Sequence, residues 1–369
     1  MSSPAETIRI AATDCLTAFG DADATLAALL RGERALRPLP ALGRDGGAPV
    51  PLALIDGRSL DETAPPAWLT PLEHFAKKIP GGDWGAPRRP VFVTSSNFGV
   101  GSLHALRRNG EKTHLATATP HATIEFLQAR LGWEKNIAVL SHACVSAQLG
   151  LFLAARQLDA GQADEALLFS FDFLSPFVTG GFQALKILNC EFPAPYQARP
   201  SGAIGLGDGA AFAVLTRDRG DLAIAGQSLH NEMHHFTANQ TDGAGFVACL
   251  APLAKAAARR RVWLKGHGTG TLEAGRLEAE AFARLFPDAP LVSWKGSLGH
   301  TLGSCALVEL ALAAAALRSG RTPGTIGSAP PAFIDAVRFS SFDNCGFDAV
   351  VCASNAFGGA HGALLLSQI

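Results

Sequence analysis

The sequence predicts an α/β fold made of two similar halves, each with an apolar helix at its centre. In the first half, an apolar strand expected at Ile137–Leu140 leads through a short turn into a helix at Val145–Ala155. In the second half, a strand expected at Leu291–Ser293 leads through a turn into a helix at Leu302–Leu317. Both helices are nearly apolar all round, and a helix without a polar face belongs inside a protein.

The two halves are placed at residues 1–216 and 217–369. The two halves repeat the order of strand, turn and apolar helix, but they share no evident sequence identity. This repetition fits an arrangement in which the buried helices pack in the middle and both turns lie at one end. Ligands of α/β sheets bind at such strand-to-helix ends.

The remaining elements follow from apolar runs and from turn-forming residues. Further strands are expected at Ile8–Ala12, Pro90–Thr94 and Val262–Leu264. The Pro/Gly-rich stretches around 37–52 and 78–90 are expected to be surface loops.

The turn of the first half carries Cys144 at the predicted start of its helix. A helix N-terminus favours a nearby anion by about 0.3–2 kcal/mol, so we expect the pKa of this thiol to be lowered. A thiolate in that position can take an acyl group from a thioester. The alternative is that Cys144 is a small buried residue that fills space among Ala and Ser neighbours.

Two histidines occupy the other turns. His267 follows the strand Val262–Leu264 in a run of alternating glycines, which let the backbone approach a ligand closely. Thr269 and Thr271 add hydroxyl groups for the polar arm of such a ligand. His300 opens the second buried helix. Two imidazoles can stabilise an oxyanion, although each could instead satisfy a helix end or the core.

Lys295 lies between a buried strand and a buried helix, where an unpaired ammonium group is costly. We therefore expect an acidic partner, and Glu278 is the candidate. The pair would tune and hold the histidines, and the alternative is a plain structural ion pair. One thiol, two imidazoles and one ammonium group together suit thioester chemistry.

Two weaker patterns are set aside. His230, His234 and His235 lie in a polar, loop-like segment where no Cys or acid completes a metal-ligand set. The glycine-dense stretch 201–209 lacks the Lys of a P-loop and the strand–helix setting of a dinucleotide fingerprint. We expect neither a metal nor a nucleotide there.

Composition narrows the classes of function. Charged residues make up 17% of the 369 residues, the formal net charge is −1, and no run of like charges occurs. We expect no nucleic-acid partner and no polybasic membrane patch. The longest apolar run, Cys305–Leu317, has 13 residues and contains Glu309, so it is expected to be too short and too polar to span a bilayer.

The seven cysteines are odd in number, widely spaced and never in a CxxC pair. Neither a disulfide framework nor a structural zinc site is expected. Met1–Arg9 has no apolar core of the kind found in secretory signals. These features favour a reduced, cytoplasmic location.

Taken together, these segments resemble the β-ketoacyl synthase family, in the Cys-His-His branch of the thiolase-like superfamily. The resemblance covers most of the chain, with the motifs in the family's order. The matching segments are Ala143-Cys144-Val145-Ser146, the HGTGT motif His267–Thr271 with Glu278 eleven residues after its histidine, Lys295 with Gly299-His300-Thr301-Leu302-Gly303, the SNAFG motif Ser354–Gly358, the glycine-rich strand Pro200–Leu215, and the opening strand and turn Ile8–Gly20.

The resemblance implies a thiolase-like five-layer αβαβα fold, usually in a dimer. It also implies an acyltransferase, a 3-oxoacyl-[acyl carrier protein] synthase that elongates chains in fatty acid or polyketide (polyene-type) biosynthesis. Cys144 would accept the acyl group. His267 and His300 would donate hydrogen bonds to the malonyl thioester oxygen as carbon dioxide leaves, and the carbanion would attack the acyl-Cys144 thioester.

The resemblance also assigns supporting roles. The backbone amides of Cys144 and Phe357 would form an oxyanion hole, and Phe357 would gate the acyl pocket. Thr269 and Thr271 would contact the pantetheine arm, and Glu278 would give structural support. No metal or redox cofactor is required, because the substrates are carried on the phosphopantetheine of acyl carrier protein. The expected partners are acyl carrier protein and either a second copy of the chain or a second ketosynthase-like subunit.

Several features depart from the family pattern. Phe357-Gly358-Gly359 is two residues shorter than the usual FGFGG, which affects the gating loop. Gly275 stands where the family usually has an Asp, and Leu168–Asp172 occupies the place of a glycine-rich turn that ends in an acid. The chain is also shorter than typical members, mostly between about 190 and 260.

Two other functions remain open. The chain could be a weakly catalytic or non-catalytic partner, similar to the chain-length-factor subunits that pair with a true ketosynthase. The divergent loops favour this alternative, whereas the intact cysteine favours the enzyme, because such factors often lose it. A thiolase is disfavoured, because thiolases need a second catalytic cysteine in a glycine-rich turn near the C-terminus. Neither Cys345 nor Cys352 lies in such a turn.

Overall fold

The computed structural model describes residues 8–41, 48–60, 69–199, 202–235 and 238–369. The first half of the chain builds a five-stranded sheet. Its strands are β1 (Arg9–Leu16), β4 (Val91–Thr94), β5 (Ile137–Leu140), β6 (Ala166–Asp172) and β8 (Gly209–Thr216). Their order in space is β5-β4-β6-β8-β1, with β5, β4 and β6 parallel and β8 antiparallel to both of its neighbours.

The second half repeats this plan. Its strands are β9 (Leu222–Asn231), β10 (Val262–Lys265), β11 (Leu291–Val292), β14 (Ala349–Ala356) and β15 (Ala360–Gln368). They lie in the order β11-β10-β14-β15-β9, with the same succession of parallel and antiparallel neighbours. Counted along the chain, both sheets have the order third, second, fourth, fifth, first. The expectation of two similar halves is therefore confirmed.

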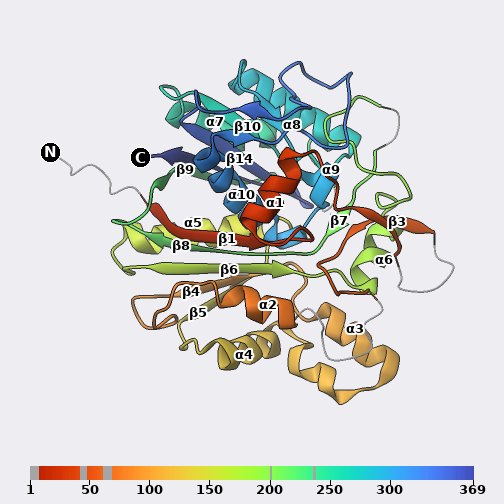
Figure 1. The fold of residues 1–369 in the computed structure, drawn as a ribbon, viewed down its shortest axis with the longest axis vertical. Helices are drawn as coiled ribbons and strands as arrows, with labels where there is room; N and C mark the ends of the chain where they lie inside the picture. The colour runs from red at the N-terminus through yellow and green to blue at the C-terminus, as the bar shows by residue number, and fades with distance from the viewer. Residues whose placement is uncertain (1–7, 42–47, 61–68, 200–201, 236–237) are drawn as a thin grey trace.

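The two sheets meet where β1 and β9 lie side by side. This junction consists of two residue pairs, Arg9 with Ala223 and Ile10 with Leu222. Beyond it the sheets separate into distinct layers, as Figure 1 shows. The packing of helices between the sheets, rather than strand pairing, therefore holds the halves together.

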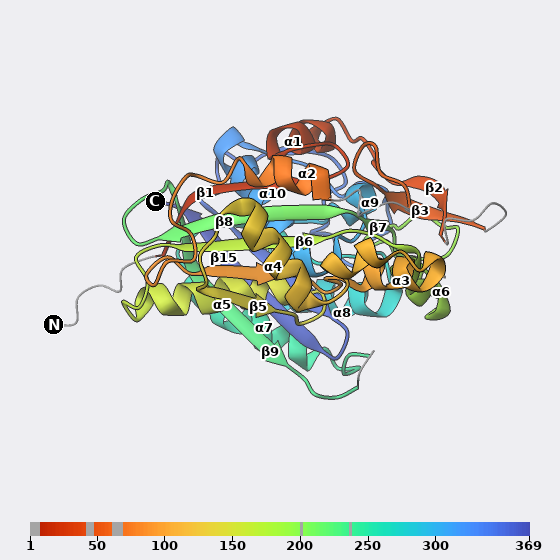
Figure 2. The same ribbon diagram turned by 90° about the horizontal axis from the view of Figure 1, so that it is seen from below.

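Helices complete the five αβαβα layers, in agreement with the expected fold (Figures 1 and 2). The middle layer contains α5 (Ser146–Asp159) and α10 (Cys305–Ser319), with α1 (Ala22–Leu30) packed against α10. The outer face of the first sheet is covered by α2 (Leu69–Ala76) and α4 (Pro120–Leu131), and that of the second by α7 (Ala244–Ala256) and α8 (Leu272–Leu285). The shorter elements are α3 (Val100–Asn109), α6 (Pro176–Ala184), α9 (Lys295–Leu298), the 3-10 turns η1 (Lys112–Thr117) and η2 (Leu302–Ser304), and the strands β2 (Arg37–Pro40), β3 (Pro49–Ala53), β7 (Leu206–Gly207), β12 (Arg321–Thr322) and β13 (Phe342–Asp343).

Strands covered on both faces explain the unbroken apolar runs in the sequence. In β14, Val350 and Cys352 face the central core, whereas Ala349 and Val351 face the outer helices. Successive side chains of a strand point to opposite faces, so a strand between two helical layers must be apolar at every position.

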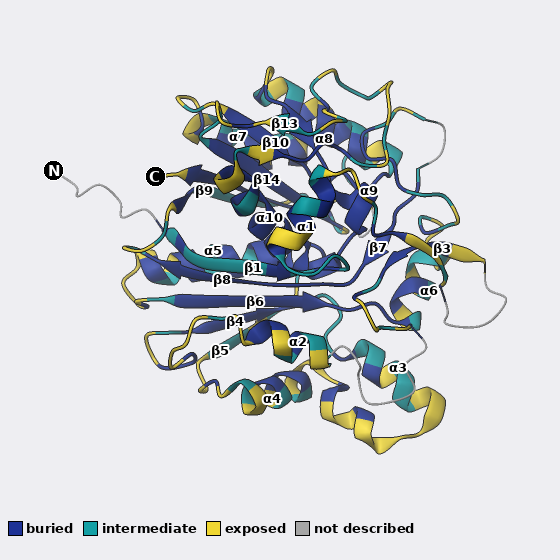
Figure 3. Cartoon of the chain, viewed as in Figure 1, coloured by how far each residue is buried: buried dark blue, intermediate teal, exposed yellow. Residues whose placement is uncertain are grey.

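The central helix α10 lies almost wholly inside the protein (Figure 3). With η2 it forms an 18-residue helical segment, Leu302–Ser319, which is long and apolar enough by composition to cross a membrane. This corrects the expectation that the apolar run is too short. Within the protein, however, 83% of the segment is buried, and a core helix of a globular protein has the same properties.

One expected loop contains strands. The stretch around 37–52 forms β2 and β3, which pair as antiparallel neighbours, and β3 also pairs with β7. The physical reason is burial, because Val50 and Leu52 pack into an apolar cluster with Leu206. Residues 42–47 of the expected loop lie outside the described residues.

Candidate active site

Cys144 lies in a tight turn between β5 and α5, as expected, with 8% of its surface exposed. The preceding residue, Ala143, has a φ of 45°, a left-handed conformation that is uncommon for residues other than glycine. The backbone NH of His142 donates to Ser146 Oγ at 2.7 Å, and this hydroxyl donates to the Ala143 carbonyl at 2.6 Å. These bonds hold the turn that puts Cys144 at the start of α5.

The expectation that the helix N-terminus lowers the pKa of Cys144 is wrong for the resting protein. Burial raises the pKa of this thiol well above its ordinary value, and Cys305 and Asp172 add to the effect, whereas Lys295 opposes it. The desolvation of a buried thiolate outweighs a helix dipole worth at most about 2 kcal/mol. The resting thiol is therefore protonated at neutral pH.

Glu278 organises the turn that carries His267. Its Oε1 accepts the backbone NH of His267 at 2.7 Å, and its Oε2 accepts the backbone NH of Gly268 at 3.0 Å. The hydroxyl of Tyr196 also donates to Oε2, at 2.7 Å. Gly268 has a φ of 37°, and a Cβ at this position would lie 2.8 Å from the Tyr196 ring. The turn therefore needs both the glycine and the buried carboxylate.

His300 follows α9, and its imidazole packs edge-on against that of His267. The ring centroids are 4.9 Å apart with an interplanar angle of 89°. Among the described residues, neither ring nitrogen of His300 nor Nδ1 of His267 has a hydrogen-bond partner. Burial lowers the pKa of both imidazoles well below the ordinary value, and Lys295 adds to this effect. The site thus presents two neutral imidazoles with unpaired nitrogens, which can donate hydrogen bonds to a ligand oxygen.

Lys295 pairs with Glu309 of α10 and not with Glu278, which corrects the expected pairing. Its Nζ lies 2.6 Å from Glu309 Oε1, and the other carboxylate oxygen contacts the Nζ of Lys265. Glu278 is unsuited to this role because backbone and side-chain donors already occupy its oxygens. Glu309 comes from the central helix, which passes close to both lysines.

Burial lowers the pKa of both Lys265 and Lys295, and the carboxylate of Glu309 raises it, with a different net result for each lysine. For Lys265 the effect of burial prevails and lowers the pKa. For Lys295 the carboxylate of Glu309 outweighs burial and raises the pKa. Lys295 is therefore a fixed positive charge beneath the two imidazoles.

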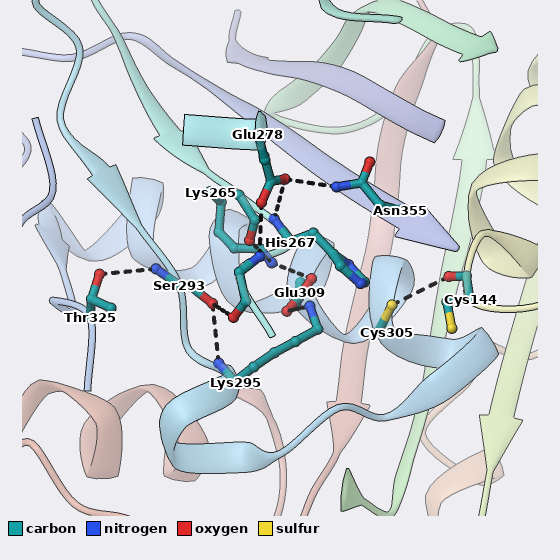
Figure 4. Close-up of polar contacts among 12 residues, drawn as sticks. Cys144, Lys265, His267, Glu278, Ser293, Lys295, Cys305, Glu309, Thr325 and Asn355 are labelled. Carbon is teal, nitrogen blue, oxygen red and sulfur yellow. Dashed lines mark hydrogen bonds and ion pairs between the residues drawn. The ribbon is translucent and has the colours of Figure 1, made fainter. Parts of the chain in front are cut away.

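The two halves meet at the nucleophile. The Sγ of Cys305, at the start of α10, donates to the backbone carbonyl of Cys144 at 3.4 Å. Figure 4 shows the side chain of His267 directed towards the side on which Cys305 and Cys144 lie, with Lys295 and Glu309 nearby. The structure therefore brings Cys144 from the first half together with the histidines and Lys295 of the second half.

The other residues expected to bind substrate lie around this centre. Thr269 and Thr271 lie before α8, with their hydroxyl oxygens 3.1 Å apart. Phe357 lies in the turn between β14 and β15 and is 38% exposed. Its ring stacks on Phe182 of α6 with a centroid distance of 6.0 Å, so the shortened turn still contacts the first half.

Two departures from the family pattern have distinct local structures. Gly275 lies inside α8, where a Cβ would meet only the Phe333 ring at 3.6 Å, so the position has room for a side chain. Asp172 ends β6 and is buried. It accepts hydrogen bonds from Ser95 Oγ at 2.6 Å and from the backbone NH of Asn97 at 3.0 Å. Burial raises the pKa of Asp172 to about 6.

Among the described residues, no group of three or more His, Cys, Asp or Glu side chains is arranged to hold a metal ion. The described part of the glycine-dense stretch, 202–209, runs into β7 and β8 rather than into a helix N-terminus. All seven cysteines are free thiols.

Sequence reasoning missed three buried polar residues of the site, Lys265, Glu309 and Tyr196, and it gave no separate role to Asn355, a half-buried residue of the SNAFG motif. A signal existed for Glu309, because it is the single charge within the apolar stretch 305–317. Lys265 gave a similar signal, because it is the single charged residue of the apolar strand Val262–Lys265. Nothing in the local sequence marks Tyr196, which reaches Glu278 from a distant loop.

Comparisons with known proteins agree with the resemblance drawn from the motifs. Residues 223–329 match the family described as "Beta-ketoacyl synthase, C-terminal domain". The 3-oxoacyl-[acyl-carrier-protein] synthase 2 of Coxiella burnetii is 30% identical over 258 residues, which is 63% of this chain and 62% of the relative. The tetracenomycin polyketide synthase ketoacyl synthase alpha subunit of Streptomyces glaucescens is 28% identical, over 64% of this chain and 61% of the relative. The chain thus spans about three fifths of the length of the curated relatives it matches.

Solved structures share the whole fold at low sequence identity. A ketosynthase (ApeO) in complex with its chain length factor (ApeC) from Xenorhabdus doucetiae matches with a TM-score of 0.79 and 22% identity, over 100% of both chains. A β-ketoacyl synthase from Burkholderia phymatum matches with a TM-score of 0.81 and 20% identity, over 99% of this chain and 100% of the other. The five-layer ketosynthase fold expected from the motifs is confirmed.

Proposed function

We propose, from the premise that this chain is a relative of the β-ketoacyl synthases, that it joins malonyl-[acyl carrier protein] to an acyl group held on Cys144. The reaction is a decarboxylative Claisen condensation in fatty acid or polyketide (polyene-type) chain elongation. The observation that carries the proposal is the pair of neutral imidazoles, His267 and His300. Among the described residues, Nδ1 of His267 and both ring nitrogens of His300 have no hydrogen-bond partner, and the His267 ring is directed towards the side on which Cys144 lies. A buried polar group without a partner is costly, and a ligand oxygen would satisfy it.

The first step transfers the acyl group to the protein. The Cys144 sulfur forms a bond to the thioester carbonyl carbon, and the bond from that carbon to the pantetheine sulfur breaks. The thiol proton ends on the released pantetheine thiol. Because the resting thiol is buried and protonated, the positive charge of Lys295, which favours the thiolate, supports this step.

The second step forms the carbon nucleophile. The bond between the malonyl carboxylate and the α-carbon breaks, and carbon dioxide leaves. The electron pair moves through the α-carbon to the thioester oxygen, which becomes an enolate oxygen. His267 and His300 donate hydrogen bonds to this oxygen, and donors preorganised in a dry site are the usual way to stabilise such a charge.

The third step joins the two chains. The α-carbon attacks the acyl-Cys144 carbonyl, whose oxygen receives hydrogen bonds from the backbone amides of Cys144 and Phe357. The carbon–sulfur bond then breaks and releases the Cys144 thiolate, which takes up one proton from solvent to return to the resting thiol. Thr269 and Thr271 contact the pantetheine arm, and Phe357 gates the acyl pocket. Glu278 supports the reaction by fixing the backbone at His267.

The proposal requires no metal or redox cofactor, because each step moves electrons between carbon, oxygen and sulfur of the substrates and Cys144. Acyl carrier protein is the proposed partner that delivers both substrates. One structural neighbour is described as a type II acyl carrier protein in complex with its ketosynthase, AntDE:AntF. A cytoplasmic location belongs to the proposal, and the seven free cysteines support it.

The second candidate is a weakly catalytic or non-catalytic subunit that pairs with another ketosynthase-like chain. Two observations favour it: the shortened turn that carries Phe357, and the burial that raises the pKa of Cys144. The neighbour from Xenorhabdus doucetiae is described as a ketosynthase bound to its chain length factor. Either a homodimer or such a heterodimer is compatible with the catalytic proposal.

Intact-protein mass spectrometry tests the proposal. The purified chain and Cys144→Ala are incubated with acyl-[acyl carrier protein] of several chain lengths, and malonyl-[acyl carrier protein] is then added. The catalytic proposal expects an acyl adduct on the native protein alone, which clears as a product two carbons longer appears. If no acyl length gives a Cys144-dependent adduct, the isolated chain is not an active ketosynthase. The partner subunit then becomes the leading function.

A further inference from the structure

A buried chain of hydrogen bonds runs from the end of β9 to the backbone of His267. It begins at Glu232, whose Oε1 lies 2.9 Å from Nε2 of His361. Nδ1 of the same imidazole lies 2.9 Å from Oδ1 of Asn355, and the Asn355 amide nitrogen donates to Glu278 Oε1 at 3.0 Å. Glu278 in turn accepts the backbone NH of His267 at 2.7 Å. Figure 4 shows the last part of this chain, from Asn355 through Glu278 to His267.

The chemistry of these groups fixes the direction of each bond. Both oxygens of Glu278 accept hydrogen bonds, from two backbone NH groups and the Tyr196 hydroxyl, so the Asn355 amide nitrogen faces Glu278 and Oδ1 faces His361. Nδ1 of His361 therefore carries a hydrogen. The bond between Nε2 and Glu232 then contains one shared proton, held either on the imidazole or on the carboxyl group. In both forms the Glu232–His361 pair has no net charge.

This pair is sealed from solvent. The side chain of His361 is 0% exposed and that of Glu232 is 1% exposed. The ring of Phe246, from α7, packs 4.4 Å from the His361 ring, and the backbone NH of Gln240 donates to the second Glu232 oxygen at 2.7 Å. A buried network of this kind has one low-energy arrangement, because a broken bond leaves a polar group without a partner.

Glu232 also anchors the turn between β14 and β15. Its backbone NH donates to the Gly359 carbonyl at 2.9 Å. Gly359 has a φ of 69°, and a Cβ there would lie 2.9 Å from the Cβ of Glu232. The same residue therefore touches the turn that carries Phe357 and begins the hydrogen-bond chain to His267.

We propose that Glu232 and His361 are positioning residues for the malonyl decarboxylation step. They hold Asn355 in the orientation that Glu278 needs in order to fix the backbone at His267. This inference rests on the proposed function and deepens it. Neither residue touches the reacting atoms. The hydrogen-bond chain ends at the backbone of His267 and does not include Cys144, so we expect its loss to affect decarboxylation more than acylation of Cys144.

The test compares His361→Ala with a matched control, His230→Ala. His230 lies on β9 with its ring centroid 6.4 Å from that of His361, and it belongs to none of the bonds in the chain described above. Carbon dioxide release from malonyl-[acyl carrier protein] and acylation of Cys144 are measured separately on the full-length protein. We expect His361→Ala to lower carbon dioxide release about tenfold, the effect of one lost hydrogen bond at the site, with acylation changed less than about twofold. The control variant should match the native protein in both measurements.

A conservative variant separates positioning from a general loss of stability. In Glu232→Gln the side-chain amide can donate to Nε2 of a neutral His361 and still accept the Gln240 NH, so every bond survives. We expect this variant to retain carbon dioxide release within about threefold of the native protein, less than the loss of one hydrogen bond. If Glu232→Gln loses as much activity as His361→Ala, or if His361→Ala lowers both half-reactions equally, the positioning role is wrong.

Hydrogen exchange measured by mass spectrometry gives a readout that needs no catalysis. We expect faster amide exchange across residues 266–271 in His361→Ala than in His230→Ala. Unchanged exchange there would overturn the inference even in an active enzyme. If the native protein neither takes an acyl group nor releases carbon dioxide, the proposed function fails. The exchange result then still decides whether the pair holds the His267 turn.

Discussion

Glu309→Gln is the most demanding test of the buried charges beneath the site. The carboxylate of Glu309 lies between Lys295 and Lys265, and the three side chains are 6%, 2% and 0% exposed, respectively. The substitution keeps the shape of the side chain but leaves two buried ammonium groups without a negative charge. Breaking a buried ion pair from one side costs about 3–5 kcal/mol, because the remaining charge has no compensation. We therefore expect the free energy of unfolding to fall by about that amount, out of a typical total of roughly 5–15 kcal/mol.

Urea unfolding followed by far-ultraviolet circular dichroism measures this change. The matched control is Glu280→Gln, which removes an exposed carboxylate paired with Arg276 within α8 and should cost less than about 1 kcal/mol. Adding Lys265→Met to Glu309→Gln removes one of the two uncompensated charges and should restore part of the loss. A Glu309→Gln protein that loses no more stability than the control would refute the reasoning. A double variant less stable than the single one would do the same.

Three further predictions concern single side chains. His300→Phe should abolish carbon dioxide release from malonyl-[acyl carrier protein] yet raise the thermal midpoint. It removes two buried ring nitrogens that have no hydrogen-bond partner in the described part of the chain, each of which costs about 1–3 kcal/mol. A lower midpoint would contradict this. Asp172 has its pKa raised to about 6, so the unfolded chain releases this proton first as the pH rises. Stability should therefore fall by about 3 kcal/mol between roughly pH 4 and pH 6, and urea midpoints of Asp172→Asn should lack this fall. Phe357→Ala removes a half-exposed ring stacked on Phe182, so it should lower the free energy of unfolding by less than about 1.5 kcal/mol. It should also broaden the range of acyl lengths that mass spectrometry finds on Cys144. An unchanged range would argue against gating.

The fold could be predicted because its two halves repeat one local pattern. The strands at Ile137–Leu140 and Leu291–Val292 lie where the apolar runs placed them, and each is followed by a reactive turn and a buried helix. Hydrophobic periodicity is a local property, so it survives in a single sequence. The prediction of a surface loop around 37–52 was wrong, because Val50 and Leu52 are buried in a cluster with Leu206, which lies far along the chain.

The sequence predicted which types of residue form the site, but not which side chains pair with one another. The repeated strand–turn–helix pattern put the turns of Cys144 and His300 at one end of the fold, and the resemblance to the β-ketoacyl synthases added His267. The structure brings the three residues into one centre. The pairing of Lys295 could not be derived, because Glu309 reaches it only after the central helix packs beneath the turn. The pKa of Cys144 was misjudged for a similar reason. A helix start is visible in the sequence, whereas the burial that raises the pKa of this thiol depends on both halves.

The narrow junction between β1 and β9 has a consequence for how the protein is made. All strands of the first sheet lie within residues 9–216, so that sheet leaves the ribosome before any strand of the second sheet has emerged. Domains fold in this order during synthesis. In the finished protein α5 packs against α10 and β9, and neither has emerged from the ribosome at that stage. The helix that follows the nucleophile therefore has an exposed apolar face during this interval, and a chaperone that binds exposed apolar surfaces can bind it then.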